Sequence, residues 1–143
     1  MIRLFIDANI FIDVTDSTRK TSTSSLAFMD KMFDNMDKYT LYTSCDLITT
    51  IYYILRKELD NDGALQQIKT ISKFISIIEF GNSEVDEAIK LMENHTKYKD
   101  LEDTIQYVMA RKEKCDYIIT NDKNFASGDV PILSSGEALK ELK

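Results

Sequence analysis

Short apolar segments alternate with longer amphipathic segments along almost the whole chain, and this alternation restricts the fold more than any other feature. Strands are predicted at residues 2–7, 40–43, 75–80, 116–120 and 130–133. Helices are predicted at residues 8–14, 23–37, 45–59, 64–74, 82–94, 101–114 and 135–142. Such alternation is typical of a parallel sheet with helices on both faces. We therefore expect a three-layer α/β/α fold with a mostly parallel central sheet.

The length of 143 residues suits one domain, which we expect to span residues 1–143. No apolar run approaches the ~20 residues that cross a bilayer, and an acid at position 7 is incompatible with a secretory signal. The two cysteines lie far apart and there is one histidine, which disfavours a zinc site. These features favour a protein of the reducing cytoplasm with no membrane association.

The net charge of −6 bears on possible partners. Proteins that bind nucleic acid without sequence preference usually carry an excess of basic residues, because phosphate contacts supply most of their affinity. The overall charge therefore argues mildly against a nucleic-acid substrate. A local basic rim can nevertheless coexist with an acidic metal pocket.

Acidic residues follow two of the predicted strands. Asp7 ends the first strand, and Asp122 follows the fourth. A third acid, Asp103, lies in the first turn of the helix that precedes the fourth strand. Ligands of open α/β sheets bind beyond the carboxyl ends of the strands, so we expect these three carboxylates to converge on one pocket.

Convergent carboxylates repel one another unless a cation lies between them, and Mg²⁺ or Mn²⁺ prefers such oxygen ligands. A bound cation of this kind can activate water for phosphodiester hydrolysis. Each acid also has a structural interpretation, since Asp7 can cap a helix, Asp122 can start a turn, and Asp100 with Asp103 can form a helix cap. These interpretations stay open for each acid taken alone.

Five segments together resemble the PIN-domain family, in particular its VapC-like toxin ribonucleases with a D-F-E-D-type motif. The segments are FIDANIFIDV, TSCDLITTIYYILRK, DLEDTIQYVMA, YIITNDKNF and VPILSSGEALKEL, and they cover nearly the whole chain. The resemblance implies a metal-dependent ribonuclease, often the toxin of a toxin–antitoxin pair. RNA as substrate, an antitoxin protein as partner and a homodimer are expectations from the family.

By position in the family pattern, Asp7, Asp103 and Asp122 would hold the metal or orient water. Asn9 would support Asp7, whereas Ser44 and Thr120 would hold the pocket through hydrogen bonds. These roles are implied by the resemblance alone.

One position departs from the pattern. Many PIN nucleases carry a glutamate six residues after the serine, and here that residue is Thr50. The Thr50 hydroxyl is expected to assist, and Glu102 or Asp46 can compensate for the lost charge. The alternative is a PIN-like binding or regulatory domain with weakened catalysis.

Two further hypotheses concern other residues. Arg19 and Lys20, in the polar segment 15–25, are candidates for contact with a phosphate backbone, against the simpler interpretation of a solvated loop. A phosphotransfer domain of the haloacid-dehalogenase type is disfavoured, because its chemistry requires a second aspartate where this chain has Asn9.

Overall fold

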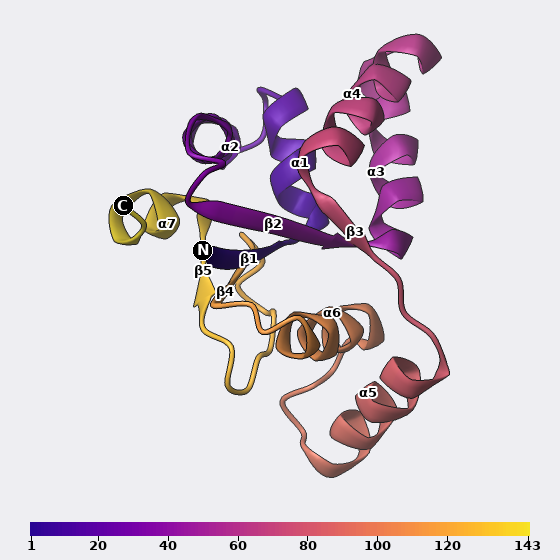
Figure 1. The fold of residues 1–143 in the computed structure, drawn as a ribbon. Coiled ribbons are helices and arrows are strands. Elements are labelled where there is room, and N and C mark those ends of the chain that lie inside the picture. Colours follow the sequence, from indigo (N-terminus) through magenta and orange to yellow (C-terminus); the bar gives the residue numbers. More distant parts are fainter.

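The computed structural model describes all residues 1–143 and contains one five-stranded sheet and seven helices (Figure 1). The strands are β1 (Ile2–Ile6), β2 (Tyr39–Ser44), β3 (Ser76–Ile78), β4 (Tyr117–Ile119) and β5 (Ile132–Leu133). The helices are α1 (Ala8–Thr15), α2 (Ser22–Asp34), α3 (Cys45–Glu58), α4 (Asn61–Phe74), α5 (Asn82–Asn94), α6 (Leu101–Lys112) and α7 (Ser135–Glu141).

The strand order is β3-β2-β1-β4-β5, and every neighbouring pair is parallel. Successive strands β1, β2 and β3 extend the sheet in one direction, whereas β4 pairs with the other edge of β1, so the order reverses between β1 and β4. In the register, Ile6 lies opposite Ile119. Ligand sites of open α/β sheets lie at such a reversal.

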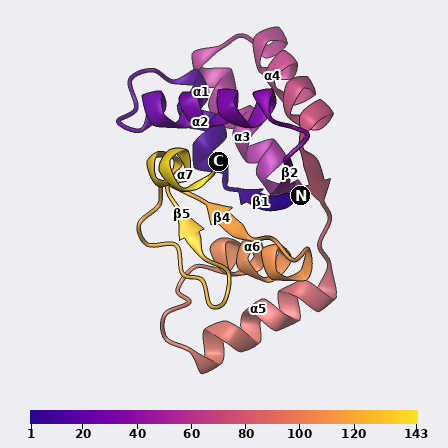
Figure 2. The ribbon, with the colours of Figure 1, turned by 60° about the vertical axis from the view of Figure 1, so that its left-hand side comes forward.

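The helices cover the two faces of the sheet unequally. Helices α1, α2, α3, α4 and α7 pack over one face, and α5 and α6 cover the other (Figure 1). The first face holds a cluster of 21 buried hydrophobic residues, and the second holds a cluster of 13. Figure 2 shows α7 beside α2, which closes the larger cluster at the carboxyl-terminal end of the chain. The strands are therefore buried on both sides, as their apolar sequences require.

The predicted α/β fold is confirmed, and the sheet is entirely parallel. The sequence predicts a break over residues 60–63, but the helix begins at Asn61. The reason is that Asp60 caps α4, accepting a hydrogen bond of 2.6 Å from the Gly63 amide. The helix predicted over 23–37 ends at Asp34. None of the helices is both long and apolar enough to span a lipid bilayer.

A fully buried carboxylate, Asp13, joins α1 to three other parts of the fold. It accepts hydrogen bonds from Arg19 (2.6 Å), Thr21 (2.7 Å), Ser25 (2.7 Å) and Asn121 (2.9 Å). Burial raises the pKa of Asp13, but these hydrogen bonds outweigh burial and hold the pKa below its ordinary value of 3.8. The carboxylate thus fixes the loop after α1, helix α2 and the turn after β4 against one another.

Removal of this carboxylate is predicted to destabilise the fold. Asp13→Ala leaves buried donors without an acceptor, so we expect the free energy of unfolding in urea to fall by about 2–4 kcal/mol at pH 7. Asp30→Ala, at an exposed position of α2, is the control and should change it by less than about 0.5 kcal/mol.

The pH dependence follows from the lowered pKa of Asp13. Its stabilisation is fully present above the ordinary value of 3.8 and is lost as the pH falls through the folded-state value. The difference between Asp13→Ala and the wild type should therefore shrink below about pH 4. A constant difference down to pH 2 would mean that the ionised carboxylate is not the source of the stabilisation.

Candidate active site

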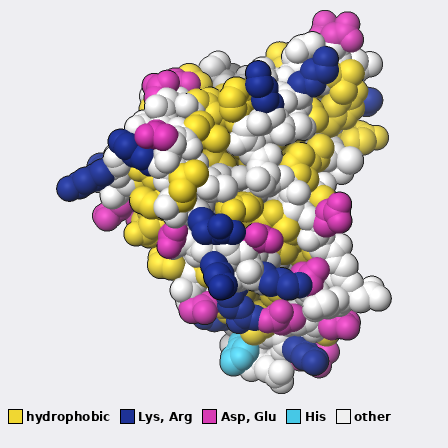
Figure 3. Space-filling view, viewed as in Figure 1, with side chains coloured by type: hydrophobic (Ala, Val, Ile, Leu, Met, Phe, Trp, Pro, Cys, Tyr) yellow, Lys and Arg dark blue, Asp and Glu magenta, His cyan; other side chains and the backbone are white.

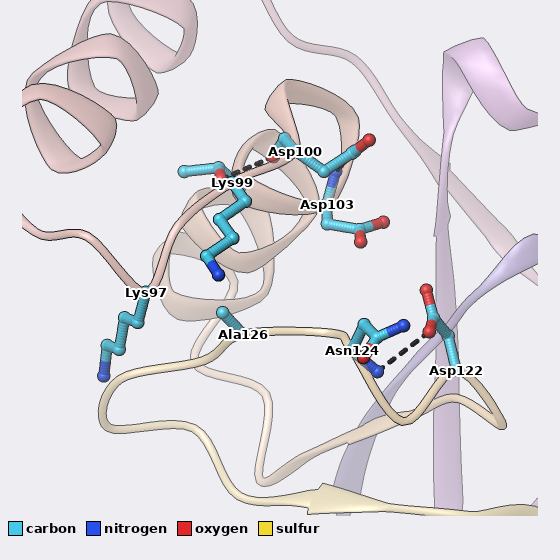
Figure 4. A pocket seen from close by; sticks show the side chains of 8 residues that line it. Lys97, Lys99, Asp100, Asp103, Asp122, Asn124 and Ala126 are labelled. Carbon is cyan, nitrogen blue, oxygen red and sulfur yellow. Dashed lines mark hydrogen bonds between the residues drawn. The ribbon is translucent and has the colours of Figure 1, made fainter.

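The carboxyl ends of β1 and β4 carry Asp7 and Asp122, and the first turn of α6 brings Asp103 to the same edge of the sheet. A cleft of about 660 Å³ opens there. It is lined by Lys97, Lys99, Asp100, Asp103, Thr104, Asp122, Asn124 and Ala126. In Figure 4 the carboxylates of Asp103 and Asp122 face each other across the cleft. The sequence predicts that three carboxylates converge on one pocket; two of them, Asp103 and Asp122, line this cleft, and Asp7 is not among its lining residues.

Asp7 is held from several sides. Its Oδ1 accepts a hydrogen bond of 2.7 Å from the Ala8 amide, which caps α1. Its Oδ2 accepts hydrogen bonds from the Thr120 hydroxyl (2.9 Å) and from the Asn9 amide nitrogen (3.0 Å). Asn9 also donates to the Thr120 hydroxyl oxygen at 3.0 Å. Asp7 is 6% exposed, so this ring of bonds fixes a buried carboxylate in one orientation.

The turn that carries Asp122 is tied to the same ring. The Asp122 amide donates to the Thr120 hydroxyl oxygen at 3.1 Å, and the Asn121 amide donates to Asn9 Oδ1 at 3.1 Å. Asp122 in turn accepts a hydrogen bond of 2.9 Å from the Asn124 amide. Its expected role in a turn is thus confirmed, and its exposed carboxylate lies at the mouth of the cleft.

The Asp103 carboxylate is free to face the cleft, because Asp100 and not Asp103 caps α6. Asp100 accepts a hydrogen bond of 2.9 Å from the Asp103 amide, as the helix-cap interpretation predicts. The Asp103 side chain makes no hydrogen bond or ion pair of its own and points into the cleft (Figure 4). The cap belongs to Asp100, which leaves the second acid available for a ligand.

Burial and mutual repulsion raise the pKa values of these acids. Burial, followed by the charges of Asp100, Asp7 and Asp122, raises the pKa of Asp103 to about 7. Burial also raises the pKa of Asp7, against the opposing hydrogen bond from Thr120. Glu102 has a raised pKa for the same reasons, burial first and then the charges of neighbouring acids that include Asp7. These acids therefore behave as one electrostatic group.

No basic side chain neutralises this group. The four ion pairs of the protein join Arg3 to Glu113, Arg19 to Asp13, Arg111 to Glu87 and Lys112 to Glu84. Hard oxygen donors with excess negative charge suit Mg²⁺ or Mn²⁺. No three of these acids lie close enough together to form a ligand set in this structure. The donors thus fit such a cation by chemistry, and the cation would have to draw them together.

A second observation at the site is the amide of Gln106, which is fully buried on α6 one turn after Asp103. It lies close enough to Asp7 to favour the ionised carboxylate, yet neither Nε2 nor Oε1 makes a hydrogen bond of normal geometry. A buried amide without a partner costs about 1–3 kcal/mol, so it is unusual in a folded protein. Gln106 is therefore a buried polar neighbour of Asp7 that favours its ionised form.

The remaining predicted residues differ in their burial and in the hydrogen bonds that they make. Ser44 is buried and donates to Asp46, and its hydroxyl contacts Met109 Sδ at 3.5 Å. Thr50 is exposed on α3 and makes no hydrogen bond. The raised pKa of Glu102, caused by burial and then by Asp46, indicates that these two acids approach each other. The structure brings Asn9 and Thr120 into hydrogen bonds with Asp7, whereas the exposed Thr50 side chain makes no hydrogen bond to these residues.

Sequence reasoning missed several residues of the site. Arg19, offered for phosphate contact, instead donates to buried Asp13. The lysines that do line the cleft are Lys97 and Lys99. Gln106 was missed because a glutamine in a helix carries no signal by itself, although its spacing of three from Asp103 places both on one face of α6.

The repulsion predicts that one carboxylate can be removed with a gain in stability. Asp103→Asn should raise the melting temperature of the metal-free protein at pH 8 by about 2–4 °C, as ~1 kcal/mol does in a domain of this size. Because the folded-state pKa of Asp103 is raised, the cost is fully present above pH 7 and declines as the pH falls toward 4. Asp62→Asn, in the first turn of α4, is the control and should not raise it. A lower melting temperature for Asp103→Asn would contradict the repulsion.

Comparison with known proteins identifies the relatives of this chain. The family model described as "PIN domain" matches residues 3–124. Ribonuclease VapC1 of Aquifex aeolicus (strain VF5) is 44% identical over 135 residues, which cover 94% of this chain and 92% of that protein.

Solved structures share the fold at low identity. VapC20 of Mycobacterium tuberculosis, described as a toxin that cleaves the sarcin-ricin loop, superposes with a TM-score of 0.68 at 11% identity, covering 85% of this chain and 92% of its own. VapBC2 of Rickettsia felis, solved with a DNA fragment from its promoter, gives 0.68 at 13% identity, covering 93% and 98%. With the matched family model and the 44% identical relative, these findings show that the chain belongs to the PIN domain family.

Proposed function

We propose that this protein is a metal-dependent endoribonuclease, the toxin component of a toxin–antitoxin pair. The observation that carries the proposal is the uncompensated acidic group of Asp7, Asp103 and Asp122 at the reversal of strand order. The family and the 44% identity to a ribonuclease support RNA as the substrate.

Asp7, Asp103 and Asp122 would hold a Mg²⁺ or Mn²⁺ ion. The bound ion supplies Lewis-acid polarisation of a phosphoryl oxygen and lowers the pKa of water. Asp7, held in one orientation by hydrogen bonds from Ala8, Asn9 and Thr120, would enter the ligand set with little side-chain freedom left to lose. Water attacks phosphorus and loses a proton to a carboxylate, one phosphorus–oxygen ester bond breaks, and the departing sugar oxygen takes up a proton from solvent.

Asp122 is the best-placed group to accept the proton of the attacking water. It is exposed at the mouth of the cleft, and its backbone is fixed through Thr120 and Asn124. Asp103 faces it from α6. Thr50 and Ser44 keep the roles that the resemblance implies only as predictions, since neither contacts these carboxylates directly. Glu102 adds negative charge near Asp7 and stands in for the missing glutamate.

An antitoxin is the proposed protein partner. Structural neighbours of this chain include a toxin–antitoxin complex from Klebsiella pneumoniae. A helix and a basic side chain from such a partner would suit Asp103 and Asp122, because no ion pair within the protein neutralises these carboxylates. A homodimer, expected from the family, stays a prediction.

The catalytic proposal predicts metal-dependent cleavage of a structured RNA pool in Mn²⁺ or Mg²⁺ and none in EDTA. Asp7→Asn should lower the rate by more than the roughly 10–100-fold that loss of a residue supporting a metal ligand costs. Asparagine caps a helix as well as aspartate does, so the fold should be retained. Asp60→Asn, the same change at the cap of α4, is the matched control and should retain full activity.

The alternative is a PIN-like binding domain with weakened catalysis, which is favoured by Thr50 at the position where many PIN nucleases carry a glutamate. Its outcome in the same assay is distinct. A folded wild type that is as inert as Asp7→Asn in both metals would exclude the nuclease.

A separate prediction concerns Gln106, which would position Asp7 for the cation. Gln106→Leu replaces an unpartnered buried amide with an apolar group of similar size, so stability in urea should be retained or increased. The dissociation constant for Mn²⁺, measured by calorimetry, should nevertheless rise about tenfold. Gln66→Leu, at an exposed position of α4, is the control. Loss of stability with unchanged Mn²⁺ affinity would assign Gln106 a packing role.

A further inference from the structure

Basic side chains are distributed in a way that restricts where an RNA strand can bind. The chain carries a net charge of −6, and the face in Figure 3 interleaves Lys and Arg with Asp and Glu. Four basic residues are already paired with acids, namely Arg3, Arg19, Arg111 and Lys112. General attraction of a polyanion by the whole surface is therefore weak, and binding requires a local site.

Lys97 and Lys99 are the two basic residues that line the cleft with Asp103 and Asp122. Figure 4 shows them toward one end of the cleft and the facing carboxylates toward the other. Neither lysine forms an ion pair. Both lysines are exposed residues, and acidic side chains share the cleft with them. The Lys99 ammonium makes no hydrogen bond, whereas the Lys97 ammonium donates one to the Ser127 carbonyl oxygen and keeps two N–H groups for an external anion.

The segment that carries these lysines is anchored. Tyr98, between them, is 6% exposed and stacks on Tyr107 with ring centroids 5.7 Å apart. Tyr107 donates to Asp129 at 2.5 Å. Tyr98 is thus buried while its two neighbours stay in solvent, so the lysines are presented from a fixed backbone rather than from a free loop.

The loop that carries Gly128 packs closely against the same two tyrosines. A Cβ on Gly128 would lie 2.5 Å from the Tyr107 hydroxyl oxygen, so only glycine allows the loop to pass so close. Lys97 reaches across and donates to the Ser127 carbonyl oxygen at 3.1 Å, with its ammonium 5.2 Å from the centre of the Tyr98 ring. These contacts hold the segment with the two lysines against the loop that carries Gly128.

We propose that Lys97 and Lys99 form a subsite for backbone phosphates of a single-stranded RNA, next to the phosphodiester that is cleaved. This inference rests on the proposed function and adds the direction in which the strand leaves the acidic group. Phosphates on the two lysines offset the repulsion that the strand meets at Asp103 and Asp122. The subsite recognises the backbone and leaves the bases unread.

The test measures binding without cleavage. Wild type and Lys97→Gln/Lys99→Gln are titrated into a fluorescein-labelled single-stranded RNA of about 12 nucleotides in EDTA, and anisotropy is followed between roughly 0.05 and 0.3 M salt. We expect affinity to fall about tenfold at 0.1 M salt. The slope of log K against log salt should decrease in magnitude by about 1.4, at about 0.7 for each phosphate contact.

The matched control is Lys69→Gln/Lys73→Gln, which removes the same charge from exposed positions of α4, at the far end of the molecule from α5 and α6 (Figure 1). It should leave affinity and salt slope close to those of wild type. Lys97→Arg/Lys99→Arg should retain binding, since charge is what the phosphates require. Equal losses in the two glutamine variants, or an unchanged slope, would overturn the subsite.

Cleavage assays separate this inference from the proposed function. If the protein cleaves RNA in Mn²⁺ and Lys97→Gln/Lys99→Gln leaves binding and KM unchanged, the subsite alone is wrong. If wild type cleaves no RNA but binds it through the two lysines, the subsite stands and the nuclease proposal fails. Stronger lysine-dependent binding of a single-stranded DNA of the same sequence would overturn RNA as the occupant.

Discussion

The pairing of β1 with β4 is the constraint on which the rest of the site depends. The Asp7 amide donates to the Ile119 carbonyl oxygen at 3.0 Å, one residue beyond the register that aligns the two strands. From that bond onward the two chain segments diverge, one into α1 and the other into the turn with Asp122. The ring of Asp7, Asn9 and Thr120 spans this divergence. A sheet with another order would separate these residues, whatever their identity.

The acids of the candidate site repel one another, and the folded structure around them keeps them close together. Its acids follow two strands and lie on one helix turn, each fixed by a local hydrogen bond with a backbone amide, and no ion pair neutralises them. The buried Asp13 contrasts with it, because four donors surround that carboxylate and its pKa falls rather than rises. The same residue type is thus a structural anchor where hydrogen-bond donors outweigh burial and a candidate ligand where burial and neighbouring charges outweigh the donors.

Much of the fold and part of the site could be predicted from the sequence, for a physical reason. Strand and helix periods report burial directly, so the order of elements was recovered, and the position of Asp7 and Asp122 after strands followed from it. Partners distant in sequence leave no such period. No pattern in residues 13–25 predicts that Arg19 donates a hydrogen bond to Asp13, or that Asn121 does so as well. Lys97 and Lys99 look like ordinary solvated lysines until the buried Tyr98 between them is seen to fix their backbone.

The order of the sheet also has a consequence for synthesis. The first strand to leave the ribosome, β1, is central, and its partner β4 is made after residue 116, with Asp122 and Asn121 close behind. A nascent chain that extends only as far as Asp7, or only as far as Asp103, therefore lacks the turn with Asp122 that completes the acidic group. The same late segment supplies the Asn121 bond to Asp13. Completion of the acidic group is thus delayed until β4 and the turn after it have been made, and a chain interrupted before them lacks it.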